Sequence, residues 1–159
     1  MKRIIIALML LCPMMASAEI PAVTQLFGDY ASNENVTIAE VDKALIQMAR
    51  GASATEEDMA VLGEIEAISV MECSDAATGG EIASTIERIV SSEELSSLLN
   101  VDAEGTNVAI YTKPVGELFS DIIVVVRETE QVVVVNIKGN FSPETLSSLI
   151  SSMNGTGLM

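Results

Sequence analysis

The stretch NVDAEGTNVAIY holds the arrangement of oxygen-bearing residues most suggestive of metal chemistry in this chain. Asn100, Asp102 and Glu104 stand at alternate positions before Gly105, as ligands do in a calcium loop. The twelfth position, however, is Tyr111, where such a loop needs a bidentate glutamate. We therefore interpret the stretch as a β-hairpin that turns at Glu104-Gly105, and we predict no metal site and no metal cofactor.

Enzymatic chemistry finds little support in the composition. The chain has no histidine, which excludes Ser-His and Cys-His nucleophile pairs and nearly all zinc sites. Gly79-Gly80 is the nearest approach to a phosphate-binding loop, but no lysine follows it, and we interpret it as a turn. Carboxylates are plentiful, yet there is no tryptophan on which a sugar ring would stack. We predict a protein that is not an enzyme, without catalytic or cofactor-binding residues.

The first residues have the pattern of an export signal. Lys2 and Arg3 precede the apolar run Ile4–Leu11, which is too short to span a bilayer as a helix. Ala16-Ser17-Ala18 offers the small residues that a signal peptidase requires, so cleavage is expected after Ala18. The alternative is lipidation at Cys12, which follows two leucines rather than the usual small residues. We expect an exported protein of the periplasm or cell envelope.

Length and charge define the mature chain. Removal of residues 1–18 leaves 141 residues, enough for one domain at 19–159, with a frayed tail expected at 154–159. Six basic residues then stand against 23 acidic ones, a net charge of −17. Such a field repels phosphate backbones and anionic lipids, so we expect neither nucleic acid nor a membrane surface as partner. No segment after the export signal approaches the length of a transmembrane helix, so we expect no transmembrane segment in the mature chain.

Cys73 is the only cysteine of the mature chain, which rules out an internal disulfide. It closes the apolar stretch AISVMEC, which favours a buried and inert thiol. An intermolecular disulfide in an oxidising compartment is the alternative.

Helices are predicted where apolar residues recur at helical spacing. The predicted helices are Val23–Tyr30, Thr37 to about Gly51, Thr55–Asp58, Thr78–Val90, Ser91–Leu99 and Pro143–Met153. Thr37 with Glu40 and Thr78 with Glu81 have the spacing of capping boxes, and Ser142 caps the last helix. Residues 36–41 are also compatible with a short strand.

Strands are predicted at Ala67–Cys73, in a hairpin of Asn100–Ala103 with Asn107–Thr112, and in a second hairpin of Asp121–Arg127 with Gln131–Lys138. The apolar runs Ile122–Val126 and Val132–Val135 do not alternate with polar residues, as central strands covered on both faces require. We predict an α+β fold in which a central valine-rich hairpin at about 121–138 belongs to a largely antiparallel sheet packed by amphipathic helices. Either helices cover both faces or a second copy covers what remains.

Several stretches taken in order resemble a known family. They are LFGDYASNENVTIAEVDKALIQMA, EIEAISVMEC, LLNVDAEGTNVAIYTK, DIIVVVRETEQVVVVNIKGNF and the closing Ser-Pro-Glu helix, with ENVT and VNIKGNF the most telling parts. The chain resembles the DUF4252 family, small exported proteins of Gram-negative bacteria with no assigned activity. In that family the region after ENVT tends to be a strand, which leaves strand and helix both open there.

Taken together, these features predict a non-enzymatic exported envelope domain that acts through protein contacts, with a partner that is either another protein or a second copy. The alternative is a small-ligand binder, or a carboxylate-based hydrolase, with its pocket between the sheet and the helices.

Overall fold

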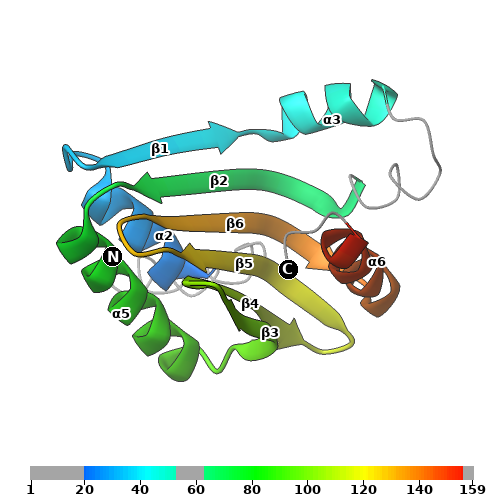
Figure 1. The fold of residues 1–159 in the computed structure, drawn as a ribbon. Helices are drawn as coiled ribbons and strands as arrows, with labels where there is room; N and C mark the ends of the chain where they lie inside the picture. The colour runs from blue at the N-terminus through cyan, green and yellow to red at the C-terminus, as the bar shows by residue number, and fades with distance from the viewer. Residues whose placement is uncertain (1–19, 53–62, 156–159) are drawn as a thin grey trace, which may run out of the picture.

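The computed structural model describes residues 20–52 and 63–155, which form a single six-stranded antiparallel sheet with helices on both faces (Figure 1). The strands are β1 Val36–Val41, β2 Ile65–Cys73, β3 Ser96–Ala103, β4 Thr106–Val115, β5 Leu118–Arg127 and β6 Val132–Phe141. Their order across the sheet is β1-β2-β6-β5-β4-β3. The helices are α2 Pro21–Tyr30, α3 Lys43–Ala52, α5 Ala76–Ser92 and α6 Pro143–Gly155. The predicted α+β class is confirmed.

The valine-rich hairpin is the centre of the sheet, as predicted. β6 and β5 are the third and fourth strands of the six, and they pair through nearly their whole length. Ile123, Val125 and Val134 point to one face and are buried to 0%, 3% and 0% exposure. Burial of each such side chain contributes roughly 1.5–3 kcal/mol to the free energy of folding. This contribution stabilises a domain whose only described cysteine forms no disulfide. Val133 and Val135 point to the other face and are only half-buried.

The two faces are covered at opposite ends of the sheet. α2 and α5 lie at one end and α6 at the other (Figure 1). The first buried cluster joins α2 and α5 to one face of β2, β5 and β6; its members include Val23, Leu26, Phe27, Met71, Ile82, Ile86, Ile123, Val125 and Val134. The second joins α3 and α6 to the opposite face; its members are Ile46, Ile65, Ile110, Ile122, Phe141 and Leu146. Helices therefore cover both faces, as we expected, but neither face completely.

Local capping explains where the two best-defined helices begin. Asp75 caps α5, since its carboxylate accepts hydrogen bonds from the backbone N–H and the hydroxyl of Thr78, at 2.8 and 2.7 Å. The prediction that Thr78 caps the helix is therefore wrong. The cap is three residues earlier, at Asp75, whose carboxylate is a stronger hydrogen-bond acceptor than the Thr78 hydroxyl. Ser142 caps α6 as predicted: its hydroxyl oxygen accepts from the N–H of Thr145 at 3.3 Å, and Pro143 is the first helical residue.

Three predicted elements differ from the structure. Residues 36–41 form edge strand β1, the strand alternative that the sequence left open, so the helix predicted from Thr37 begins instead at Lys43, after Asp42 accepts a hydrogen bond from the N–H of Leu45. The short helix predicted at Ser91–Leu99 does not form, because Ser91 and Ser92 end α5 and the chain continues as β3. Gly79-Gly80 lies inside α5, so the turn predicted there is wrong.

Other predictions fall on residues outside the described ranges. These are the export signal with its cleavage position, the alternative lipidation at Cys12, the short helix at Thr55–Asp58, and residues 156–159 of the predicted frayed tail. The first two residues of that tail, 154 and 155, belong instead to α6. Among the described residues, no helix combines the length and the apolar character that crossing a bilayer demands.

Candidate functional site

The end of the sheet that α6 leaves uncovered carries a set of half-buried valines, which we call the valine face. Its members are Val70, Val101, Val108, Val126, Val133 and Val135. The strand register places them in two adjacent rows on one side of the sheet: Val101, Val108, Val126 and Val133 stand opposite one another on four neighbouring strands, and Val135 pairs with Val70 in the next row. None of the six belongs to either buried cluster of the described chain. The valine face is therefore apolar surface that no helix of residues 20–52 and 63–155 covers.

Carboxylates surround this end of the sheet. Glu72 lies in the same row as Val133, on the next strand, and its carboxylate accepts a hydrogen bond from the side chain of Gln131 at 2.6 Å. Glu104 at the β3–β4 turn and Glu128 and Glu130 at the β5–β6 turn line one shallow hollow where the two hairpin tips meet. All four glutamates are exposed. We call this group the acidic rim.

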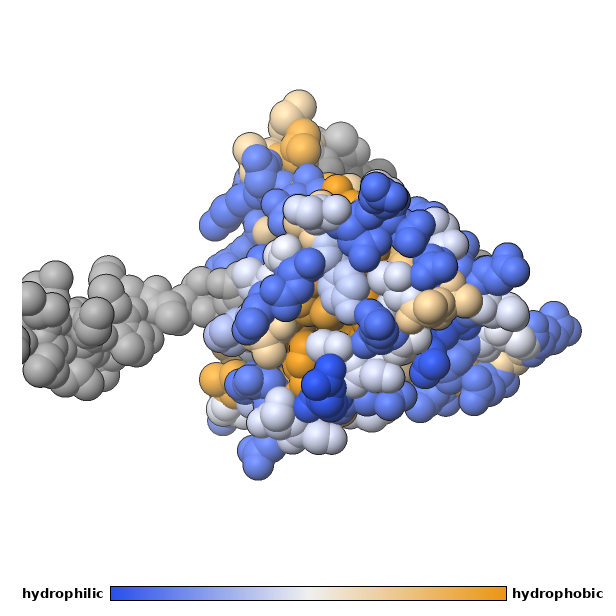
Figure 2. Space-filling model, turned by 90° about the vertical axis from the view of Figure 1, so that its left-hand side faces the viewer, coloured by the Kyte–Doolittle hydropathy of each residue, from blue (hydrophilic) through white to orange (hydrophobic). Residues whose placement is uncertain are grey.

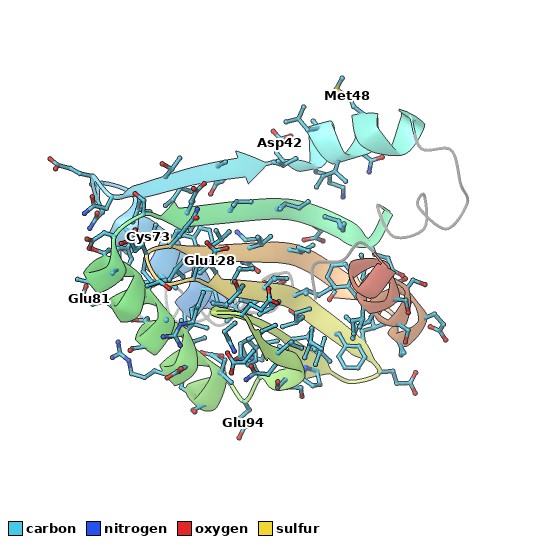
Figure 3. All side chains as sticks on the ribbon, in the orientation of Figure 1. Asp42, Met48, Cys73, Glu81, Glu94 and Glu128 are labelled. Carbon is cyan, nitrogen blue, oxygen red and sulfur yellow. The ribbon has the colours of Figure 1, made fainter. Side chains whose placement is uncertain are left out.

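Figure 2 shows this end of the molecule from outside. Polar side chains predominate there, and hydrophobic ones show through only as a band between them. Figure 3 locates Glu128 at the hairpin end, on the same side of the molecule as Glu81 and Cys73 and away from Met48 on α3.

The opposite face of the same strands holds a second feature, a half-open hollow of about 440 Å³ between α5 and strands β3, β4 and β5. Its floor is apolar, with Ile86, Ala109 and Val125 all buried. Its wall is polar and includes Asp102, Asn107 and Arg127. We call this feature the α5 hollow.

The calcium-like stretch of the sequence contributes to this wall. It forms the predicted β3–β4 hairpin, whose turn contains Glu104 and Gly105 in left-handed backbone conformations, with φ of 52° and 83°. The amide of Asn107 donates hydrogen bonds to the side-chain oxygens of Asn100 and Asp102, at 2.9 and 3.0 Å. Within residues 20–52 and 63–155, no group of three or more His, Cys, Asp or Glu residues could share a metal ion. The hairpin interpretation is confirmed.

The VNIKGNF stretch has a packing role that local sequence reasoning did not identify. Gly139 donates its N–H to the buried carboxylate of Asp121 at 3.4 Å, and Asp121 itself has a positive φ of 52° where β5 is irregular. The hydroxyl of Thr112 donates to the carbonyl of Asp121 at 2.6 Å. Phe141 is fully buried in the second cluster. These residues fix the strand ends below α6 and lie away from both candidate surfaces.

Two further titratable groups lie near the helices. Cys73 is fully buried, as predicted, with its sulfur 3.5 Å from the carbonyl oxygen of Asp75. Tyr30 on α2 donates to Glu81 on α5 at 3.4 Å, and its pKa is raised, first by partial burial and then by the charge of Glu81. Both groups connect α2, α5 and β2, and neither lines the α5 hollow.

Comparison with known proteins identifies the family. Residues 30–149 match the family described as Domain of unknown function (DUF4252). The chain belongs to DUF4252. No curated protein and no solved structure matches it. The match to DUF4252 confirms the resemblance inferred from ENVT and VNIKGNF.

Both candidate surfaces lie inside the DUF4252 match. The valine face spans Val70 to Val135, and the α5 hollow spans Ala83 to Thr129. Most of α2 precedes the match, which begins at Tyr30. Each surface is thus built entirely from the DUF4252 domain.

Proposed function

We propose that this protein is a non-enzymatic, exported module of the cell envelope that binds another protein through the valine face. The observation that supports this most directly is the set of six half-buried valines on the uncovered end of the sheet. A contiguous apolar surface bordered by polar residues is typical of a binding site. The partner that fits is an apolar segment with basic flanks, because the acidic rim borders the valines.

Size and charge both argue against a second copy as this partner. The six valines, already half-buried, expose far less than the roughly 800 Å² per partner that a stable interface buries. Each copy carries a net charge of −15, or −17 without Lys2 and Arg3, so two copies that face each other repel. A slender peptide segment needs less area and gains from opposite charge.

Export rests on the first residues, Lys2, Arg3 and the apolar run that follows them. In a Gram-negative host, we expect the full chain to be recovered from the periplasmic fraction with Glu19 as its new N-terminus. Recovery of an intact N-terminus in the cytoplasm contradicts this part of the proposal.

Binding is tested with two synthetic peptides that share an apolar core and differ only in their flanks, lysine in one and glutamate in the other. We expect the lysine-flanked peptide to shift the backbone amide resonances of β3, β4, β5 and β6. The double variant Val126→Thr and Val133→Thr keeps the side-chain shape but replaces one methyl group of each side chain by a hydroxyl. It should abolish these shifts, because the apolar contact with the peptide is lost.

The control variant is Glu144→Gln, which removes one exposed charge in the first turn of α6, at the opposite end of the sheet from the valine face. It should leave the binding of the lysine-flanked peptide almost unchanged, whereas Glu72→Gln should weaken it. Equal binding of the two peptides, shifts outside these strands, or no binding at millimolar peptide each contradict the proposal.

A further inference from the structure

The α5 hollow exists because α5 covers only part of its face of the sheet. α5 packs against β2 and β6, where Gly79 lies close to Val132, and the hollow lies between α5 and strands β3 and β4. Two small residues, Ala83 on α5 and Ala109 on β4, line the space between helix and sheet. The result is a hollow of about 440 Å³, within the range of small-molecule sites.

The floor of the α5 hollow suits a short hydrocarbon chain. Ala83, Ile86, Ala109 and Val125 line it with 2%, 2%, 4% and 3% exposure, so their polar backbone atoms are covered. Ala109 and Val125 stand opposite each other on β4 and β5, and the half-buried Tyr111 lies next along β4. An alkyl chain that lies against this floor removes its own apolar surface from water.

The wall of the hollow is predominantly negative. Asp102, Glu87 and Glu128 line it against a single cation, Arg127. The guanidinium of Arg127 is directed at Glu87, with 3.6 Å between the nearest nitrogen and oxygen. Arg127, the one cation of the wall, is paired with Glu87, and the wall has three carboxylates. The wall therefore favours a positively charged ligand over an anion.

Asn107 orients the carboxylate of Asp102 in the wall of the hollow. The register places Asp102, Asn107 and Arg127 opposite one another on β3, β4 and β5, one row beyond Ala109 and Val125. Both amide hydrogens of Asn107 are used, one on Asn100 and one on the Oδ1 atom of Asp102. Asp102 has a second carboxylate oxygen, and an ammonium group pairs well with a carboxylate that is already held in place.

We propose that the α5 hollow binds a small organic cation, a protonated primary amine on a short alkyl chain. The ammonium group pairs with Asp102, and the alkyl chain lies on the floor between Ala109, Val125 and Ile86. A hard metal ion fits poorly because it requires several oxygen ligands, and the apolar floor provides none. The site lies on the opposite face of the sheet from the valine face, and of the four acidic-rim residues only Glu128 also lines the hollow.

The test uses matched probes on the full mature chain. n-Butylammonium and butyrate have similar size and opposite charge, and each is titrated while backbone amide resonances are recorded. We expect n-butylammonium to shift resonances of β3, β4, β5 and α5 around the hollow, and butyrate to leave them unchanged. Equal shifts with butyrate, or n-butylammonium shifts spread over the whole surface, overturn the proposal.

Two variants separate a built site from a diffuse negative field. Asp102→Asn should weaken n-butylammonium binding about tenfold, the usual effect of losing one charged hydrogen-bond partner. Glu34→Gln removes the same charge far from the hollow and should change the affinity by less than about twofold, since exposed charges are screened within roughly 10 Å. Equal weakening by the two variants means that only the overall charge attracts the probe, which overturns the proposal.

Filling the hollow provides a charge-independent check. Ala109→Val adds two methyl groups to the floor and should reduce n-butylammonium binding without any change of charge. If Asp102→Asn disturbs the hairpin, Glu87→Gln repeats the charge test from α5, on the other side of the hollow. Unchanged affinity in Ala109→Val places the probe elsewhere and overturns the proposal.

Discussion

Gly139 on β6 lies against the backbone carbonyl oxygen of Glu64, so closely that no Cβ atom fits between them. The contact occurs where β6 passes the start of β2, at the register shift next to Ile65. Backbone atoms of neighbouring strands cannot move aside independently, because each strand is held by its ladder of hydrogen bonds. The glycine in VNIKGNF is therefore a requirement of packing.

We expect Gly139→Ala to destabilise the fold by about 1–3 kcal/mol or more, since the added methyl group has to displace backbone. Urea unfolding followed by circular dichroism measures this change. Gly28→Ala is the control, because nothing lies within 4 Å of a Cβ atom at Gly28. Equal effects of the two substitutions would show that the Glu64 contact is not close in solution.

Gly79 and Gly80 provide an internal comparison, since they are adjacent in α5 but face different surroundings. A Cβ atom at Gly80 meets nothing within 4 Å, whereas one at Gly79 lies 2.8 Å from a methyl group of Val132. Gly80→Ala should stabilise the protein by about 0.5–1 kcal/mol through helix propensity. Gly79→Ala gains the same propensity but overpacks the helix against β6, and we expect a net loss of about 0.5–2 kcal/mol.

Thermal unfolding of both glycine variants gives the sign of each effect directly. Opposite signs confirm that α5 contacts the sheet through Gly79, which sets the height of the helix above β6. Stabilisation by both substitutions would mean that α5 lies further from the sheet, and the α5 hollow would then be wider than described.

Asp75 should make α5 stability depend on pH. Hydrogen bonds from the hydroxyl and then the N–H of Thr78 lower the pKa of Asp75. A carboxyl whose folded pKa lies below its unfolded value, about 3.9, stabilises the fold above that value and loses this contribution as the pH falls through the folded pKa. The Tm difference between the native protein and Asp75→Ala should therefore be constant from pH 7 to pH 5 and shrink below about pH 4.

The control for this measurement is Thr78→Val, which removes the hydroxyl donor and keeps the N–H donor. It should reduce the pH dependence without abolishing it, because the side-chain bond is the larger cause of the lowered pKa. A Tm difference that is the same at pH 3 and pH 7 contradicts the role of the charged cap.

The sequence was sufficient to predict the centre of the sheet and its last helix. Unbroken valine in Ile122–Val126 and Val132–Val135 has few explanations besides a pair of central strands, and β5 and β6 have that place. Ser142 and Pro143 together mark a helix start that does not depend on distant contacts. These signals are local, which is why they were reliable.

The errors occurred where pairing with a distant strand decides the conformation. Leu95, Leu98 and Leu99 have helical spacing, but Glu94 adopts a positive φ of 53° that ends α5, and pairing with β4 then makes the segment a strand. At residues 36–41 the sequence left helix and strand both open, and the strand forms because β2 supplies hydrogen-bond partners along their whole length.

Neither candidate surface follows from local sequence alone. The valine face depends on where α6 ends its cover of the sheet, and the α5 hollow depends on Ala83 lying across from Ala109. Both surfaces result from the packing of helices on the sheet, which no local pattern in the sequence reveals. What the sequence did indicate was the alternative that a pocket between sheet and helices contains carboxylates, and Asp102 and Glu87 line such a hollow.

Cys73 should behave as an inert thiol. It is fully buried between β1 and β6, with Val36 and Val132 as its strand neighbours. A thiol reagent such as dithionitrobenzoate reaches it only when the domain opens, so we expect no reaction in the native protein and complete reaction in urea. Ser97→Cys places a thiol at an exposed position of edge strand β3 and should react at once. A disulfide-linked dimer of the native protein on a non-reducing gel contradicts this prediction.

The acidic rim should keep the mature protein monomeric although the valine face is open. Light scattering at tens of micromolar protein in about 0.15 M salt should give the mass of one chain, because the valines expose too little area for a stable dimer and the charges repel. In about 1 M salt the screening length falls to roughly 3 Å, which removes the repulsion between two copies. Only the apolar area of the valine face then determines whether a dimer forms. A monomer under both conditions leaves the valine face to a partner of different composition. A dimer already in 0.15 M salt contradicts the choice of a basic partner and assigns the valine face to a second copy of the chain.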